Sequence, residues 1–169
     1  MKAFFKLSIF ILLVHLLTGC GAQQTPETIA QTLIKHYQSG EFKQAVQLFL
    51  PQSDAYRVAE VIDIPKGFLR AGGVTGEADY KERIANVLKA KRNSLKISWK
   101  QVKFEKLEIK STKKHLASLE TLQGVLLLKG KVMFQQAIKL VKFQGSLYLW
   151  EVGELDRYRA SKLTLAHFD

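Results

Sequence analysis

Between residues 25 and 62, three segments carry apolar side chains at helical spacing, every three or four residues. The first begins with Thr25-Pro26 and ends at Ser39-Gly40, which are typical start and end signals of a helix. The three apolar stripes are Ile29, Ala30, Leu33, Ile34 and Tyr37; then Phe42, Ala45, Val46, Phe49 and Leu50, before Pro51; then Ala55, Val58, Ala59 and Ile62. This spacing predicts a helical hairpin followed by a shorter third helix from Ser53 to Ile62.

Between Ile64 and Gly76 the helical spacing is lost, and the glycines there predict a loop. Phe68 and Leu69 lie within this loop, so we expect them either to plug the core or to face a partner. If the domain has a cavity, they are the candidate lid residues. Helical spacing resumes from Glu77 to Lys91. Its predicted inward residues are Tyr80, Ile84, Val87 and Leu88.

After Asn93 the apolar period changes to two, which predicts strands. Leu95, Ile97 and Trp99 form the first alternating run. The alternation then shifts at Val102 and Phe104 and shifts back at Leu107 and Ile109, which indicates β-bulges. The later runs are Leu116 to Leu128, with Gly124 as a break, then Val132 to Leu140, then Leu147 to Val152 after the hairpin turn Phe143-Gln144-Gly145-Ser146.

Helices followed by an antiparallel sheet of four to five strands predict an α+β fold, with the helices on one face of the sheet. The openings of the first two helices, Thr25-Pro26-Glu27 and Ser39 to Ala45, and the closing stretch from Lys139 to Val152 resemble the nuclear-transport-factor-2-like superfamily. This resemblance implies N-terminal helices packed on a strongly bent, cone-like sheet over residues 25–155. Residues 156–169 are then a polar C-terminal tail.

The N-terminal stretch resembles a bacterial lipoprotein signal. Lys2 and Lys6 precede an apolar run of about 11 residues, roughly 16 Å as a helix and too short for a bilayer core of about 30 Å. Leu17-Thr18-Gly19-Cys20 then matches the lipobox. The resemblance implies that residues 1–19 are a cleaved signal peptide, that Cys20 receives the lipid, palmitate included, and that residues 20–24 form a tether. The alternative is an ordinary secretory signal with a chance cysteine.

Charge and cysteine content narrow the possible partners. Cys20 is the only cysteine, so no disulfide within the chain is expected. Removal of residues 1–19 lowers the formal net charge only from +11 to +9. A basic domain held beside a membrane can bind anionic lipid head groups or an anionic envelope polymer, whereas export argues against nucleic acid.

Seven lysines gather in the first predicted strand region: Lys96, Lys100, Lys103, Lys106, Lys110, Lys113 and Lys114. They form either a patch for an anionic partner or the solvated outer face of a charge-protected sheet edge.

Catalytic and metal-binding residues are not evident. His36, His115 and His167 remain after cleavage, and the sequence pairs none of them with an acid. Because the chain has no His-x-His or Glu-x-x-His pair, we expect neither a metal nor another cofactor. The loop Gly72 to Gly76 lacks the Gly-Lys-Ser/Thr ending of a phosphate-binding loop.

An apolar pocket is the most specific candidate site. Five aromatic residues are its predicted lining: Tyr37, Trp99, Phe104, Phe134 and Trp150. The same residues could simply fill the core.

These observations predict a lipid-anchored cell-envelope protein without catalytic activity. Gly21, not Asp, follows Cys20, which resembles lipoproteins sent to the outer membrane in enteric-type sorting and implies a location there facing the periplasm. We expect it to act as a non-catalytic binding or scaffolding module for another envelope component. The alternatives are a periplasmic carrier of a small apolar ligand and a pocket enzyme of the isomerase or dehydratase type, as in some cone-fold relatives.

Overall fold

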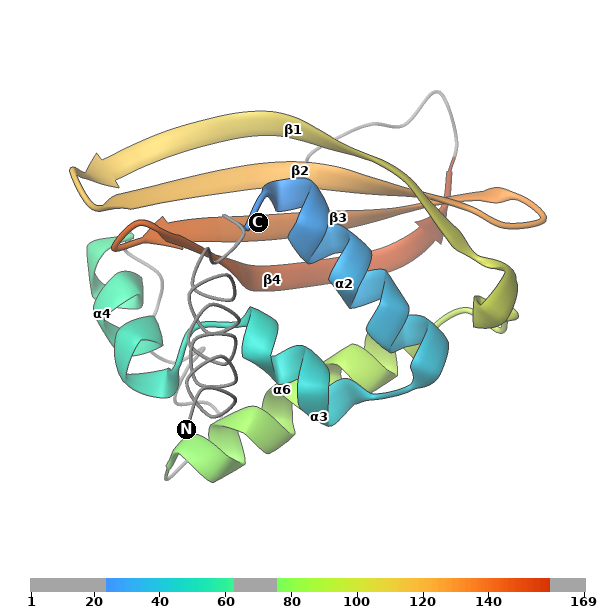
Figure 1. The fold of residues 1–169 in the computed structure, drawn as a ribbon, viewed down its shortest axis with the longest axis horizontal. Helices are drawn as coiled ribbons and strands as arrows, with labels where there is room; N and C mark the ends of the chain where they lie inside the picture. Colours follow the sequence, from blue (N-terminus) through green and yellow to red (C-terminus); the bar gives the residue numbers. More distant parts are fainter. Residues whose placement is uncertain (1–23, 63–75, 159–169) are drawn as a thin grey trace, which may run out of the picture.

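Helices occupy the first half of the chain and strands the second (Figure 1). The computed structural model describes residues 24–62 and 76–158. Within them the α-helices are α2 (Pro26–Ser39), α3 (Phe42–Ala45), α4 (Gln52–Val61) and α6 (Glu77–Asn93). The strands are β1 (Lys103–Leu116), β2 (Leu119–Lys129), β3 (Met133–Phe143) and β4 (Ser146–Arg157). They form one antiparallel sheet in the order β1-β2-β3-β4, so the predicted α+β fold is confirmed.

Helix α2 follows its sequence signals closely. The Thr25 hydroxyl accepts a hydrogen bond from the backbone N–H of Thr28 at 3.2 Å, and Pro26 occupies the first turn. Gly40 ends the helix with φ of 79°, a conformation that glycine adopts without strain. All five predicted stripe residues are buried, and together they form one wall of the main core.

The predicted second helix is wrong beyond Ala45. Helix α3 ends there, the 3₁₀ helix η1 (Val46–Leu48) follows, and Phe49 is extended. Phe49 forms a parallel bridge with Leu149 at the edge of β4, and Leu50 precedes Pro51, which disfavours helical geometry. Pairing with the sheet therefore replaces the last helical turn.

Helices α4 and α6 agree with the predicted segments, with one exception. Ala55, Val58 and Ala59 of α4 are buried, and so is Leu88 of α6. Val87 was expected to face inward, but 44% of its surface is exposed. Apart from Gly76, the predicted glycine-rich loop with Phe68 and Leu69 lies outside the described residues.

The first predicted strand, Leu95 to Trp99, is also wrong. Trp99 begins the 3₁₀ helix η2 (Trp99–Gln101), and β1 starts only at Lys103. The Trp99 indole N–H donates to the carbonyl oxygen of Arg92 at 2.9 Å, and its ring packs edge-on against Tyr37. These contacts attach Trp99 to the helices, and the Ile97 N–H donates to the Leu95 carbonyl oxygen at 3.0 Å, so the segment turns tightly and forms no strand.

The bulges and the last hairpin are confirmed. The pairing of β1 with β2 shifts register between Phe104 and Lys106 and again between Ile109 and Ser111. Gln144 and Gly145 have φ values of 50° and 83°, as a two-residue hairpin turn with both central residues left-handed requires.

Gly124 does not break its strand, in contrast to the prediction. It lies inside β2 opposite Ile109, and an added Cβ would lie 3.0 Å from the Glu108 carbonyl oxygen. Glycine at this position therefore permits close strand packing and does not mark a turn.

Two hydrophobic clusters hold the layers together. The main cluster joins α2, Leu88 of α6 and the helix-facing side of β2, β3 and β4, and Phe104 and Leu107 of β1 pack against it. The second joins α4 to Leu119 and Val141. No helix among the described residues is both long enough and apolar enough to cross a membrane.

Candidate functional site

A groove of about 330 Å³ lies between α6 and β4. Its walls consist of Tyr80, Arg83, Ile84, Val87, Leu88 and Lys91 from α6, Leu149, Trp150, Glu151 and Val152 from β4, and Phe49. Eight of these eleven side chains are apolar or aromatic. Its volume lies at the lower end of the range typical of small-molecule sites.

The sequence of α6 explains one wall of the groove. Tyr80, Ile84, Val87 and Leu88 lie on one side of the helix, since residues three, four, seven and eight apart share a face. Both Val87 and Leu88 were predicted to face the core. Leu88 is fully buried, but Val87 is partly exposed. Val87 lines the groove, so a residue predicted to lie in the core borders an open space.

A bulge in β4 shapes the opposite wall. Lys139 pairs with Glu151 and Leu140 with Leu149, which leaves Trp150 as an extra residue on β4. Such a bulge redirects a side chain out of the regular alternation. Trp150 lies in this bulge and lines the groove.

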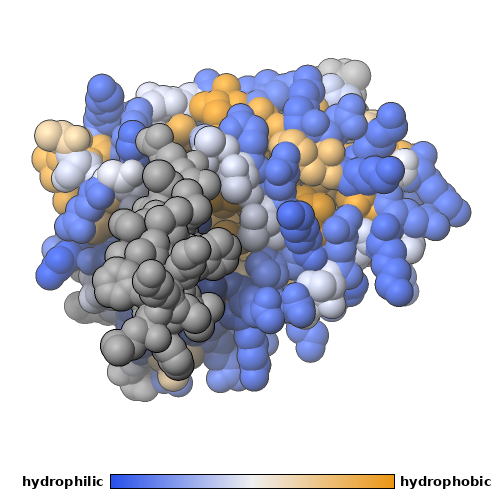
Figure 2. Space-filling view, viewed as in Figure 1, coloured by the Kyte–Doolittle hydropathy of each residue, from blue (hydrophilic) through white to orange (hydrophobic). Residues whose placement is uncertain are grey.

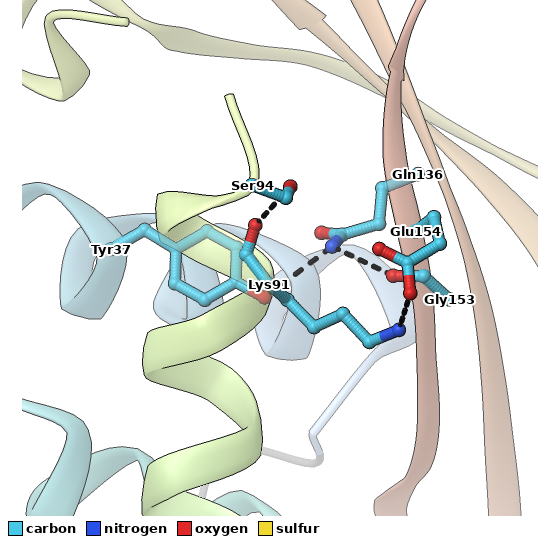
Figure 3. Close-up of polar contacts among 6 residues, drawn as sticks. All are labelled: Tyr37, Lys91, Ser94, Gln136, Gly153 and Glu154. Atoms are coloured by element: carbon cyan, nitrogen blue, oxygen red, sulfur yellow. Dashed lines mark hydrogen bonds and ion pairs between the residues drawn. The ribbon is translucent and has the colours of Figure 1, made fainter. Parts of the chain in front are cut away.

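Three charged side chains line the groove, and two of them are paired. Lys91 forms an ion pair with Glu154, a contact that links α6 to β4 (Figure 3). Glu151 forms an ion pair with Lys139 at 3.2 Å. Arg83 is exposed, and no hydrogen bond or ion pair joins it to any other residue in the described ranges.

Tyr80 is the other polar group on the α6 wall. Burial, with smaller contributions from Glu77 and Tyr56, raises the pKa of its phenol well above the ordinary value. The hydroxyl is therefore neutral and able to donate a hydrogen bond. Because Tyr80 and Arg83 are three residues apart on the helix, their side chains are neighbours.

Four of the five aromatic residues predicted to line a pocket lie elsewhere. Tyr37, Trp99 and Phe134 are buried in the main core cluster, and Phe104 packs against it. The rings of Tyr37 and Trp99 have their centres 4.9 Å apart. Only Trp150 of the five lines the groove.

A buried polar pair completes this filled region. Gln136 is fully buried, and its amide nitrogen donates to the Gly153 carbonyl oxygen at 3.2 Å and to the Tyr37 hydroxyl at 3.4 Å (Figure 3). Its side-chain oxygen has no hydrogen-bond partner among the described residues. Burial also raises the pKa of Tyr37 strongly, so its phenol is not an acid at neutral pH.

The histidines do not converge. His36 lies on α2, where burial lowers its pKa against a smaller opposing effect of Glu41. His115 lies on β1 with a ring nitrogen 2.9 Å from the Thr121 hydroxyl, and desolvation lowers its pKa too. His167 and Cys20 lie outside the described residues. Within the described ranges, no group of histidine, cysteine and acidic side chains has the arrangement of a metal site.

The seven predicted lysines are all exposed, and five belong to the edge strand β1. Figure 2 shows hydrophilic side chains among apolar patches along the upper rim, where β1 runs in the same view. Hydrogen bonds from Lys106 and Lys110 lower the pKa of Glu108 to about 2. Glu108 therefore offsets part of the positive charge at the centre of β1.

No protein-family model matches the chain, and no curated protein or solved structure shows significant similarity to it. The function is therefore inferred from the groove, the surface charge and the sequence.

Proposed function

We propose that this chain is a lipid-anchored, non-catalytic binding protein of the bacterial cell envelope, attached through Cys20 to the outer membrane and facing the periplasm. We further propose that the groove between α6 and β4 binds a small apolar molecule. The observation that supports this second statement is the groove itself, with its 330 Å³ volume and predominantly apolar walls. The anchor is supported by the lipobox residues Leu17 to Cys20.

Burial of apolar surface would drive binding. A ligand in the groove covers the exposed part of Val87 and contacts Ile84 on the same helix and Trp150 on β4. Each 100 Å² of apolar surface removed from water is worth about 2.5 kcal/mol before the costs of association.

Filling the groove is the direct test. Val87→Trp places a large ring there from a position that already tolerates exposure. Ala90→Trp is the matched control, because Ala90 is an exposed residue of the same helix that does not line the groove. With phenylnaphthylamine, a neutral apolar dye, we expect Val87→Trp to weaken binding at least tenfold and Ala90→Trp to leave it unchanged. Equal binding by the two variants would contradict the proposal.

The anchor has its own test. We expect Cys20→Ser to abolish both signal-peptide cleavage and palmitate labelling in cells, since the thiol that accepts the lipid is gone. Normal palmitate labelling of this variant would show that the lipid is attached elsewhere or that the signal is of another type.

Scaffolding on an anionic envelope polymer is the second candidate function, favoured by the exposed lysines of β1. Charge reversal of Lys103, Lys113 and Lys114 together removes three cations that are not paired with Glu108. We expect only a modest loss of co-sedimentation with purified cell-wall material, because such exposed contacts are individually weak and screened by salt. Complete loss would instead make β1 the principal binding surface.

A further inference from the structure

Among the described residues that line the groove between α6 and β4, one cation has no ion-pair partner. Lys91 and Glu151 line it, but each is neutralised by an ion-pair partner, Glu154 and Lys139 respectively. Arg83 lines it too and has no such partner among the described residues. An otherwise apolar groove with one uncompensated cation is complementary to a molecule that has an apolar body and one negative charge.

The position of Arg83 fixes where that negative charge would lie. Arg83 lies near the start of α6 and lines the groove, so its guanidinium group is the cation that a negative head group would meet there. A carboxylate accepts two parallel hydrogen bonds from a guanidinium group, a geometry that a single ammonium group cannot provide.

The remainder of the α6 wall suits an apolar chain. From Arg83 to Lys91 the helix advances by about 12 Å at 1.5 Å per residue. Ile84, Val87 and Leu88 lie in this interval, and Leu149 and Val152 belong to the facing wall. A volume of 330 Å³ equals the share of about eleven liquid waters at 30 Å³ each, which is enough for a single chain of moderate length.

We infer that the groove binds a single-chain amphiphile with a carboxylate head, of the fatty-acid type, with its head at Arg83 and its chain along Ile84 and Val87. This inference rests on the proposed function, since it names the chemical class of the molecule that the groove binds. Lys91 is a poorer head-group site because Glu154 already neutralises it.

The experiment uses residues 21–169, which retain every residue of both core clusters because the first of them is Ile29. Dodecanoate, dodecanol and dodecylamine are compared, below their micelle concentrations, as competitors of phenylnaphthylamine. These probes share one chain and differ in head-group charge. We expect dodecanoate to bind about fivefold more tightly than dodecanol, the size of effect typical of a solvent-accessible charge pair, and dodecylamine to bind most weakly.

Two variants locate the head group. Arg83→Gln should abolish the preference for dodecanoate over dodecanol while leaving dodecanol affinity unchanged. Lys91→Gln, the matched control on the same helix, should retain the preference. The inference is overturned if wild-type protein binds dodecanol as tightly as dodecanoate, or if Arg83→Gln retains the preference, and in both cases the proposed function survives. If neither phenylnaphthylamine nor any of the three amphiphiles binds, the proposed function and the inference fail together.

Discussion

Helices α2 and α6 both pack against the sheet, but α2 buries its whole apolar stripe, whereas α6 leaves part of its own beside an open groove. On the α2 side, Tyr37 and Trp99 fill the space between helix and strands, and Gln136 completes the packing. On the α6 side, Val87 stays partly exposed. The core is therefore filled on the α2 side and borders an open groove on the α6 side, where Leu88, Leu149 and Val152 belong both to the main cluster and to the groove wall.

The difference has a local cause in each helix. The α2 stripe includes the small residue Ala30, fully buried, which permits a close approach to the sheet. Helix α6 meets β4 at the edge of the sheet, where the bulge at Trp150 interrupts regular pairing. There only Ala85 and Leu88 of α6 are buried, and the rest of its apolar face borders the groove.

Shortening one side chain in each apolar stripe should give the largest difference in unfolding free energy between α2 and α6. Leu33→Ala leaves a cavity in the filled side, and we expect it to lower the free energy of unfolding by about 3 kcal/mol. Val87→Ala removes a side chain that already meets solvent, so its cost should be below about 1 kcal/mol. Urea unfolding of both variants measures the difference. Similar losses for the two would mean that α6 is packed as tightly as α2.

Removing the hydroxyls of Tyr37, which is buried, and of Tyr80, which is half-buried, should give a smaller difference in unfolding free energy. Tyr37→Phe removes the hydroxyl that accepts a hydrogen bond from Gln136, and we expect a loss of about 1 kcal/mol in unfolding free energy. Tyr80→Phe removes a hydroxyl with no hydrogen bond to a described residue, and its cost should be close to zero. A larger loss for Tyr80→Phe would reveal a structural role for that hydroxyl.

Alkaline pH should lower the free energy of unfolding through Tyr37, on the α2 side, and through Tyr80, on the α6 side. Burial raises the pKa of Tyr37 and of Tyr80, so the folded protein keeps both phenol protons where the unfolded chain releases them. Stability is therefore complete below the unfolded pKa near 10 and falls as the pH rises above it, by about 0.4 kcal/mol per tyrosine at pH 10 itself. The double variant Tyr37→Phe with Tyr80→Phe should lose stability less steeply between pH 9 and 11. An unchanged slope would contradict the burial of these phenols.

The ion pair between Lys91 and Glu154 should make the smallest contribution to the free energy of unfolding. Lys91 and Glu154 are both partly exposed, so we expect a coupling energy of about 0.5 kcal/mol or less, and none in 1 M salt. A double-mutant cycle with Lys91→Gln and Glu154→Gln measures it by unfolding. A coupling above about 2 kcal/mol would mean that this pair holds the groove closed.

Elements with local signals were predictable from the sequence. The cap at Thr25, the left-handed turn at Gln144-Gly145 and the parity shifts near Phe104 each depend on residues a few positions apart. Elements whose structure depends on contacts with residues far along the chain were not predictable from the sequence. Trp99 follows the strand pattern but packs on Tyr37, and Phe49 follows a helix pattern but pairs with β4.

The groove belongs to this second class. Its walls come from α6 and β4, about sixty residues apart, and no local pattern indicates that two apolar segments will fail to close on each other. Trp150 was identified as a lining residue from its aromatic character alone. Val87 was recognised as apolar but assigned to the core, because periodicity specifies a face and not how completely that face is covered.

Methyl NMR of residues 21–169 during titration with phenylnaphthylamine tests most directly whether the groove is the binding site, because the aromatic dye shifts the signals of methyl groups beside it. We predict shifts at Ile84, Val87, Leu88 and Val152, with Leu33 and Ile138 of the filled core unchanged. Shifts at Leu33 and Ile138 without shifts at the groove methyls would place binding in the core and contradict the account.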